Sequence, residues 1–536
     1  MKSKKQKKEF PKPSPYRTGT PFGYFVRKLQ NISKGLAPLP TSRLTLLAIP
    51  SGSRGVTVML VLAFMGIFVF LLGTILSYTL TQGKYGRALY AREQALSIAE
   101  AGLEYYRWFL AHNPTIMVAG VGLVSPYTHV VNDPEGSRLG EATITAAAQL
   151  SCGSVQWVDM VSEGKSDANV LFKRTLSSRY MRPSVAEYSN LLNANVWAGA
   201  DRNITGRYFS NGGIRMDGTN NSTVESAVST WTCTSSFGCS PNQSQPGVFG
   251  AGSGSALWSY PESSFDFAGI STPFTTLDGY ASTQGIKLNP TNVRVDGVQQ
   301  GSTHSSVGGS DQRGYRLVFN SNNTVTVYRV TGTSAAQSQH TDNPGVWVND
   351  YHTITSESLK GTYTIQQDCP IIYAQAKVWI EGTIGNKVTI IAADTGSFSP
   401  DIILNNNISY ASGTGSSGIT AIAERSVLIP LVSPENMTIR GVFVAQNGYV
   451  GRNYYQVGGS NGVPSAYNSY VQQGTLTTIG SVISNNRVGT KWTCGGSFCS
   501  GYNNRVDTYD RLLAFSPPPF TPAASPDYKL VLWREQ

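Results

Sequence analysis

The sequence has few charged side chains and few of the residue types that carry catalysis. Only 14% of its 536 residues are Asp, Glu, Lys or Arg, against about a quarter in an average domain, and five are histidines. No HExxH, no P-loop and no strand-bound GxGxxG that opens a helix occurs, because the glycine clusters GAGSGSA and ASGTGSSG lie among β segments. The sequence therefore gives no support for a zinc protease or a phosphate-binding fold, and we expect no cofactor.

Candidates for catalysis are equally scarce. Nucleophilic catalysis needs a Ser or Cys beside a His, whereas the histidines here lie in polar stretches that we interpret as loops. Asp394 and Asp401 are the nearest match to the paired carboxylates of glycan-active β-helix enzymes, but AADTGSFSPDII is more typical of a turn, and it lacks the DxDxDG spacing of a calcium loop. We expect no catalytic residue, no metal and no enzymatic activity. A glycan-active β-helix enzyme is the less favoured alternative.

The positive charge is confined to the start of the chain. Residues 1–54 hold twelve Lys or Arg and one acid, Glu9, which gives 12 − 1 = +11, whereas the whole chain carries +10 and the remainder therefore −1. Phosphate binding needs cations clustered on a folded surface rather than on a tail. We predict no nucleic-acid partner.

A long uncharged segment follows this basic leader. From Val56 to Leu80 the sequence VTVMLVLAFMGIFVFLLGTILSYTL has no charged residue, and as a helix it would be about 37 Å long, more than the hydrocarbon core of a bilayer. We predict a single membrane-spanning helix with membrane lipid around it. Because the Lys and Arg residues precede it, we expect a cytoplasmic N-terminus and an extracytoplasmic or cell-surface body.

Helical spacing continues beyond the membrane segment. Asn113 and Pro114 then stop the pattern, since proline lacks an amide proton and disfavours helix in the residue before it. We expect one helix to run to about His112. Its apolar positions are Ala88, Ala91, Ala95, Ile98, Ala99, Leu103, Tyr106 and Leu110.

The six cysteines suit an extracytoplasmic body. Four of them lie in two short, similar loops, Cys233 to Cys239 and Cys494 to Cys499, which predict two local disulfides and leave Cys152 and Cys369 as a third couple. Six cysteines allow fifteen connectivities. Zinc is a weaker alternative, because the loop spacings are long for zinc ligands and no histidine clusters near either loop.

The larger part of the chain predicts β structure. Short apolar runs such as VWIEGTI and VTIIAA alternate with Gly, Ser, Asn and Thr, and a motif recurs at 204–214, 439–449 and 478–488, the first and third copies each followed by a Trp-Thr-Cys cassette. A strand closed by an Asn-Gly corner is the repeat unit of a β-solenoid, and a recurring corner Asn can form a ladder. A β-sandwich with Asn-Gly hairpins would use the same residues and remains the alternative.

These patterns predict a mainly β protein in five parts: a basic disordered leader (1–55), a transmembrane and extended helix (56–112), a small β subdomain (113–194), a repeat-containing β body (195–515) and a proline-rich tail (516–536). The fold class is thus a long N-terminal helix, a small α+β region and a large β-solenoid-like or β-sandwich ectodomain.

Shorter segments give finer expectations. We interpret residues 182–192 as a helical connector and residues 528–533 as a final strand. Tyrosines are close together at Tyr454 and Tyr455 and again at Tyr467 and Tyr470. If exposed, these rings would suit adhesion to a surface glycan or protein, although a packed turn would use the same residues.

The anchor resembles a known family. Arg54-Gly55 before the hydrophobic helix, followed by Ala-Leu-Ser-Ile-Ala-Glu-Ala-Gly-Leu-Glu-Tyr-Tyr over 95–106, is similar to PilX-type minor pilins. The resemblance covers roughly residues 50–112. It implies that a prepilin peptidase cuts between Gly55 and Val56, and that the helix then packs against other pilins or pseudopilins in a type IV pilus-like filament. The residues that the resemblance places on this assembly helix are Leu60, Gly66, Gly73, Glu100 and Gly102.

The sequence departs from the pilin pattern at two points. Major pilins usually carry Glu at the fifth mature position, where this chain has Leu60, a feature shared with several minor and tip subunits. The leader of 55 residues is also much longer than usual. We therefore expect a non-enzymatic minor pilin or pseudopilin-like subunit that displays a β body for assembly or adhesion. An uncleaved, membrane-anchored surface structural or adhesive protein is the alternative.

Overall fold

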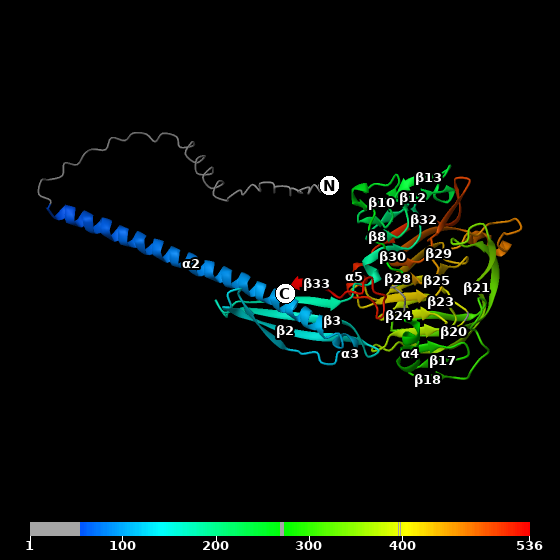
Figure 1. Cartoon of the computed structure of the whole chain (residues 1–536), viewed down its shortest axis with the longest axis horizontal. Coiled ribbons are helices and arrows are strands. Elements are labelled where there is room, and N and C mark those ends of the chain that lie inside the picture. The colour runs from blue at the N-terminus through cyan, green and yellow to red at the C-terminus, as the bar shows by residue number, and fades with distance from the viewer. Residues whose placement is uncertain (1–53, 269–272, 395, 397) are drawn as a thin grey trace, which may run out of the picture. The chain divides into compact units, whose positions relative to one another are not determined.

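The computed structural model describes residues 54–268, 273–394, 396 and 398–536 (Figure 1). The chain divides into two compact units, residues 1–83 and 84–536. Helix α2 (Arg54–His112) supplies the described part of the first unit and the start of the second. The expected leader over 1–55 lies almost wholly outside the described residues.

The second part of α2 packs on a five-stranded antiparallel sheet (Figure 1). Of the eight apolar helix positions expected to form one face, seven are buried and Ala88 is half-buried, so the predicted helical periodicity is confirmed. A short helix, α3 (Ile116–Ala119), follows the stop at Pro114. The sheet order is β1 (Tyr127–Asn132), β2 (Arg138–Ser151), β3 (Ser154–Ser166), β4 (Lys173–Met181) and β33 (Lys529–Glu535).

The body contains two parallel sheets between which the chain alternates. One holds β22 (Ile371–Ala374), β24 (Lys387–Ala392), β26 (Gly418–Ala423), β28 (Asn436–Ala445) and β30 (Gln472–Ser484). The other holds β23 (Lys377–Ile384), β25 (Ile402–Tyr410), β27 (Val427–Ile429) and β29 (Val450–Arg452). Each strand pairs in parallel with the next but one along the chain, so that successive passes of the chain stack.

The apolar core lies inside this stack. Ile390, Ala421 and Phe443 are register partners on three successive strands, and all three are fully buried. The predicted mainly β class is confirmed. A sandwich of antiparallel hairpins would pair neighbouring strands, so the pairing of alternate strands supports the solenoid, which we keep as our hypothesis for the architecture.

The chain enters this stack in the middle. Strand β5 (Tyr188–Leu192) pairs in parallel with β30, and β8 (Arg207–Ser210), β11 (Val224–Ser226) and β15 (Trp258–Ser259) continue outward from it. The chain then passes to the other end of the sheet, at β16 (Ile286–Leu288), which pairs with β22. The last strand of the stack, β30, therefore pairs with β5, the first strand of the body.

The helical connector expected over 182–192 is wrong. Residues Val185–Glu187 form one 3-10 turn, and all five residues of β5 are buried in the sheet. Helical spacing was imitated because both faces of this strand are covered, which removes the polar alternation that marks a half-buried strand. The first strand of the body thus precedes the expected boundary at 195.

An antiparallel arm extends the second sheet. Strand β19 (Gly314–Asn320) pairs in parallel with β23 and antiparallel with β20 (Thr324–Gln339), which pairs with β21 (Trp347–Thr364) (Figure 1). The remaining elements are β6 (Val196–Ala198), β7 (Asn203–Ile204), β9 (Ile214–Met216), β10 (Thr219–Asn220), β12 (Thr230–Cys233), β13 (Gln243–Pro246), β14 (Val248–Phe249), β17 (Val293–Val295), β18 (Val298–Gln300), β31 (Lys491–Cys494), β32 (Ser497–Thr508), α4 (Phe274–Gln284) and α5 (Arg511–Phe515).

The proline-rich tail links the body to the small sheet. Its backbone exchanges hydrogen bonds with the segment before β5, from Val185 N to the Pro522 carbonyl (2.9 Å) and from Ala524 N to the Pro183 carbonyl (2.7 Å). It then ends in β33, antiparallel to β4, so the predicted final strand is confirmed. The Cys152–Cys369 disulfide joins the β2–β3 turn to the body across 217 residues.

Candidate functional site

The first half of α2 presents a continuous run of exposed apolar side chains. Every large apolar side chain that the structure describes between Val56 and Leu80 is at least half exposed. The helix is long and apolar enough to cross a membrane. At Gly66 and Gly73 an added Cβ would meet nothing within 4 Å, so both positions are uncovered. Leu60 lies on the same surface, 53% exposed.

The second half of α2 uses small residues for a different contact. A Cβ on Gly164 of β3 would lie 2.1 Å from the Ala95 carbonyl oxygen and 2.4 Å from Ala99 N, so helix and strand touch backbone to backbone. A Cβ on Gly102 would lie 2.5 Å from the Ala142 Cβ. Gly102 therefore seats the helix on its own sheet, whereas Glu100, also expected on the assembly surface, is exposed.

Gly55 and Val56, the expected cleavage residues, lie in the first turn of α2. An added Cβ on Gly55 would meet nothing within 4 Å. Cleavage at this join would remove residues 1–55. Of these, residues 1–53 lie outside the described residues. Cleavage at this join stays a prediction.

The six cysteines form the three expected pairs, Cys152–Cys369, Cys233–Cys239 and Cys494–Cys499. The two local loops have different surroundings. Cys233 and Cys239 are buried beside Trp231 and Phe237, whose rings meet edge to face at 5.2 Å. Cys494 is exposed, so the second loop lies at the surface. Among the described residues, no three His, Cys, Asp or Glu side chains group as a metal site would require.

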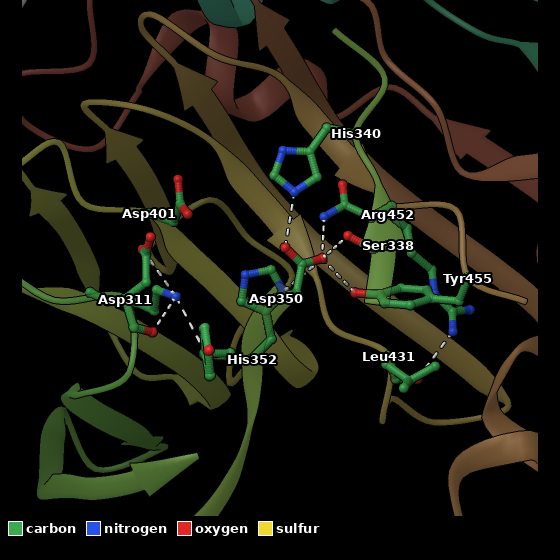
Figure 2. Close-up of polar contacts among 12 residues, drawn as sticks. Asp311, Ser338, His340, Asp350, His352, Asp401, Leu431, Arg452 and Tyr455 are labelled. Carbon is green, nitrogen blue, oxygen red and sulfur yellow. Dashed lines mark hydrogen bonds and ion pairs between the residues drawn. The ribbon is translucent and has the colours of Figure 1, made fainter. Parts of the chain in front are cut away.

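The densest polar cluster of the body surrounds Asp350 of β21 (Figure 2). Its Oδ1 lies 2.9 Å from His340 Nε2, and its Oδ2 accepts hydrogen bonds from Ser338 Oγ (2.6 Å), Asn453 Nδ2 (2.5 Å) and Tyr455 Oη (3.2 Å). These groups come from β20, β21 and the segment after β29. One buried carboxylate thus fastens the antiparallel arm to the parallel stack.

A second set of charges adjoins this cluster. Lys377 Nζ, almost fully buried, donates to the Asp311 carbonyl (2.7 Å) and lies 3.3 Å from Asp311 Oδ1. Arg425 bridges Asp311 (2.9 Å) and the buried Asp401, to which its Nε donates at 2.8 Å. The charges therefore alternate in sign and neutralise one another, as buried charges must.

Burial and pairing act on these groups in opposite directions. Burial alone would raise the pKa of Asp350, but His352 and the bonds from His340 and Ser338 outweigh it and hold the pKa below its usual value. Burial lowers the pKa of His352 to about 4, against the attraction of Asp350. For His340 burial is outweighed by Asp350, which raises the pKa. At neutral pH Asp350 is therefore charged and His352 is neutral.

The cluster lines a cavity of about 250 Å³, but its geometry is not that of a nucleophilic site. Ser338 donates to Asp350 and not to a histidine, and four donors already occupy the carboxylate. His352 Nδ1 is buried without a hydrogen-bond partner among the described residues. The arrangement holds strands together through a saturated carboxylate.

Sequence reasoning missed this cluster because it placed every histidine in a polar loop. That expectation is wrong for His352, which lies within β21 and is 4% exposed. The spacing of Asp350 and His352, two residues apart, could have signalled that both point to one face of a strand. Asp394 and Asp401 are not brought together as a catalytic pair: Asp401 binds Arg425, whereas Asp394 N donates to Glu424 Oε2 (2.8 Å).

Of the four tyrosines considered for adhesion or for a packed turn, only Tyr455 is in the core. Tyr455 is 1% exposed and packs with Leu431 and Val471, with Tyr467 and Tyr470 partly buried against the same cluster. The packing of these three agrees with the packed turn. Tyr454, which points to the other side of the strand, is half-buried.

Comparison with known proteins gives little to transfer. No protein-family model matches the chain, and no curated protein matches it. The structure is similar to that of the competence-associated pilin ComZ from Thermus thermophilus, with 12% sequence identity, a TM-score of 0.29, and coverage of 83% of this chain and 97% of that chain. At this identity and TM-score the likeness carries no argument about function.

Proposed function

We propose that this chain is a minor pilin or pseudopilin-like subunit of a type IV pilus-like filament, without enzymatic activity, which presents its β body outside the cytoplasm. The observation that carries the proposal is the division of α2 into two halves. The first exposes an uncharged apolar surface that lipid or other helices must cover, and the second is fixed on a sheet by backbone contact at Gly164. Such a helix could anchor the chain through its first half and carry the sheet on its second half.

Assembly would use the apolar half of α2. Neighbouring helices could approach closely at Gly66 and Gly73, because glycine has no side chain and no other part of the described chain covers either position. Leu60 provides an apolar contact where a glutamate would need a partner for its charge. The other pilins and a prepilin peptidase are the expected partners, the peptidase cutting between Gly55 and Val56 from the cytoplasmic side.

A non-enzymatic body fits the state of its acidic residues. Asp350 and Asp401 are bound by fixed donors, and a general acid or base needs a free position toward substrate. The alternative of a glycan-active enzyme would require Asp394 or Asp401 to turn over a saccharide. Loss of such turnover in Asp394→Asn, with the fold intact, would support that alternative and contradict the proposal.

The proposal is tested by Gly55→Leu in cells that make prepilin peptidase and a pilus-like filament. We expect the variant to keep its leader, to stay in the membrane fraction and to be absent from filaments sheared off the surface. Gly83→Leu, a matched change on the same helix with equally open surroundings, is expected to be processed normally. If wild type and Gly55→Leu both keep the full-length leader and both stay in the membrane, the chain is an uncleaved surface protein.

A further inference from the structure

Strand register places a set of aromatic and amide side chains on one outer face of the body. Gln337 lies opposite Asn349, and Gln339 lies opposite Trp347, in the β20–β21 pair. Gln339 also forms an antiparallel bridge with Tyr454, with both backbone hydrogen bonds at 3.0 Å. Because opposite residues and residues two apart share a face, these five side chains lie on the same side of the three segments.

The opposite face of the same segments fixes this orientation. Ser338, Asp350 and Tyr455 each lie next in sequence to a member of the outer set, and all three meet in the buried cluster, where Ser338 and Tyr455 point toward Asp350 (Figure 2). The outer side chains therefore cannot turn inward without breaking the hydrogen bonds that Ser338 and Tyr455 donate to the buried Asp350 carboxylate. The surface is built in advance of any partner.

The aromatic members pack against one another. The ring centroids of Trp347 and Tyr454 are 5.7 Å apart with the ring planes inclined at 53°, and those of Tyr454 and Trp492 are 5.7 Å apart with the planes at 66°, edge to face. All three rings are half-buried. The exposed loop closed by the Cys494–Cys499 disulfide contacts this set, with Cys494 Sγ 3.6 Å from Tyr454 Oη. We call Trp347, Tyr454, Trp492, Gln337, Gln339 and Asn349 the aromatic–amide face.

The chemistry of this face is neutral. None of its six side chains is charged, and the nearby Lys491 is turned to the Asn503 carbonyl (2.5 Å). Gln337 Nε2 donates to Asn349 Oδ1 (3.0 Å), which leaves the Gln337 oxygen and the Asn349 amide nitrogen without a partner among the described residues. A phosphate or a carboxylate would find no counter-charge here, whereas a hydroxyl could both donate and accept.

We propose that the aromatic–amide face binds a neutral saccharide chain. Exposed parts of aromatic rings bury the apolar C–H surface of a pyranose, and neighbouring amides bond the hydroxyl groups at its edge. Three rings that contact one another at inclined angles, with three amides beside them, cover an area larger than one pyranose, which suits an oligosaccharide rather than a single sugar. The inference holds however the chain is anchored, so its failure would leave the proposed pilin role untouched.

The test uses the full chain purified in a polyoxyethylene detergent, which has no sugar head group. Cellohexaose, chitohexaose and maltohexaose serve as neutral probes, and hexagalacturonate as the charged one, with binding measured by calorimetry and tryptophan fluorescence. We expect at least one neutral hexasaccharide to bind. We expect Trp347→Ala and Tyr454→Ala each to weaken it at least tenfold, with Trp347→Phe retaining most of the affinity.

The control is Trp533→Ala, which removes a more exposed tryptophan (43%) from β33 of the small sheet and should leave binding unchanged. Unfolding midpoints of all variants check that the body is intact, and Tyr454→Ala keeps the test valid if Trp347→Ala does not fold. Absence of binding at millimolar saccharide, binding that neither alanine variant weakens, or preference for hexagalacturonate would overturn the proposal. Self-association lost in Tyr454→Ala without any saccharide effect would assign the face to protein contact and would also overturn it.

Discussion

The side chain of Asn193 donates a hydrogen bond to that of Asn485 at 2.7 Å, although 292 residues separate them in sequence. Asn193 also accepts one from Asn211 at 2.6 Å. The three residues follow β30, β5 and β8, which are neighbours in the sheet, so the bonds run from one pass of the chain to the next as a ladder. The corner asparagines thus join β5, the strand at which the chain enters the sheet, to β30 and β8, which flank it on either side.

This ladder predicts a measurable contribution to stability. Asn193→Ala removes two side-chain hydrogen bonds at an exposed corner, and we expect it to lower the free energy of unfolding by about 1–2 kcal/mol. Denaturant unfolding of the detergent-purified chain measures the change. Asn221→Ala is the control, because that exposed side chain makes no hydrogen bond within the described residues. Equal effects of the two variants would contradict a role for the ladder.

The close contact between α2 and β3 predicts a sharp steric effect. Gly164→Ala places a Cβ 2.1 Å from the Ala95 carbonyl oxygen, so the helix must move away from the sheet. We expect a loss of about 1–3 kcal/mol, seen as faster amide hydrogen exchange in β2, β3 and β4. Gly86→Ala, on an open position of the same helix, should leave exchange in these strands unchanged. Unchanged exchange in Gly164→Ala would refute the contact.

Removing the charge of Asp350 should loosen the antiparallel arm. In Asp350→Asn an amide nitrogen faces donors that now lack an acceptor, and we expect a loss of about 3–5 kcal/mol. Hydrogen exchange in β20 and β21 should rise before the parallel strands respond. The matched variant Asp342→Asn changes an exposed carboxylate nearby and should have little effect. Similar exchange in both variants would show that the cluster does not hold the arm.

The buried His352 predicts a pH dependence of stability. Its pKa is about 4 in the folded chain and about 6.5 when unfolded, so between these values the unfolded state binds more protons. The free energy of unfolding should therefore rise with pH through this window, by on the order of 3 kcal/mol, and fall as pH drops toward 4. His340, whose pKa is raised by Asp350, acts in the opposite sense, and its contribution is lost as pH rises beyond its folded pKa.

His352→Phe separates the two histidines. It keeps a planar ring but cannot titrate, so the rise between pH 4 and 6.5 should flatten in this variant. His112→Phe, at the exposed end of α2, should retain the wild-type profile. A profile that keeps its full slope in His352→Phe would assign the dependence to other groups.

The sequence repeat predicted more of the architecture than any single predicted helix or strand did. Ile439 and Thr478, which begin two copies of the motif, are register partners in the β28–β30 pair, and the copies stay in register to Ala445 and Ser484. Gly206, Gly441 and Gly480 take the same place in their copies, and all have positive φ. Recurrence in the sequence therefore indicated contact in space for the second and third copies, whereas β5 separates the first copy from them.

Predictions from local sequence failed where the structure of a segment is set by contacts with residues far away in the sequence. The segment before Asn193 lies between two motif copies in the sheet, but Tyr188–Leu192 is buried on both sides and was interpreted as a helix. The Asp350 cluster gathers residues from 311 to 455, a range over which sequence spacing is uninformative. Likewise Gly102, expected to serve assembly, is committed to the chain's own sheet by Ala142, a residue forty positions away.

The most direct test of the account is the N-terminal mass of the chain recovered from membranes and from sheared surface filaments, with and without prepilin peptidase. With the peptidase, we expect a chain that begins at Val56, shorter by 55 residues, and we expect this form in the filaments. Without the peptidase, we expect the intact chain in membranes alone. A chain that begins at Met1 in every fraction would contradict the pilin assignment and leave a membrane-anchored β protein.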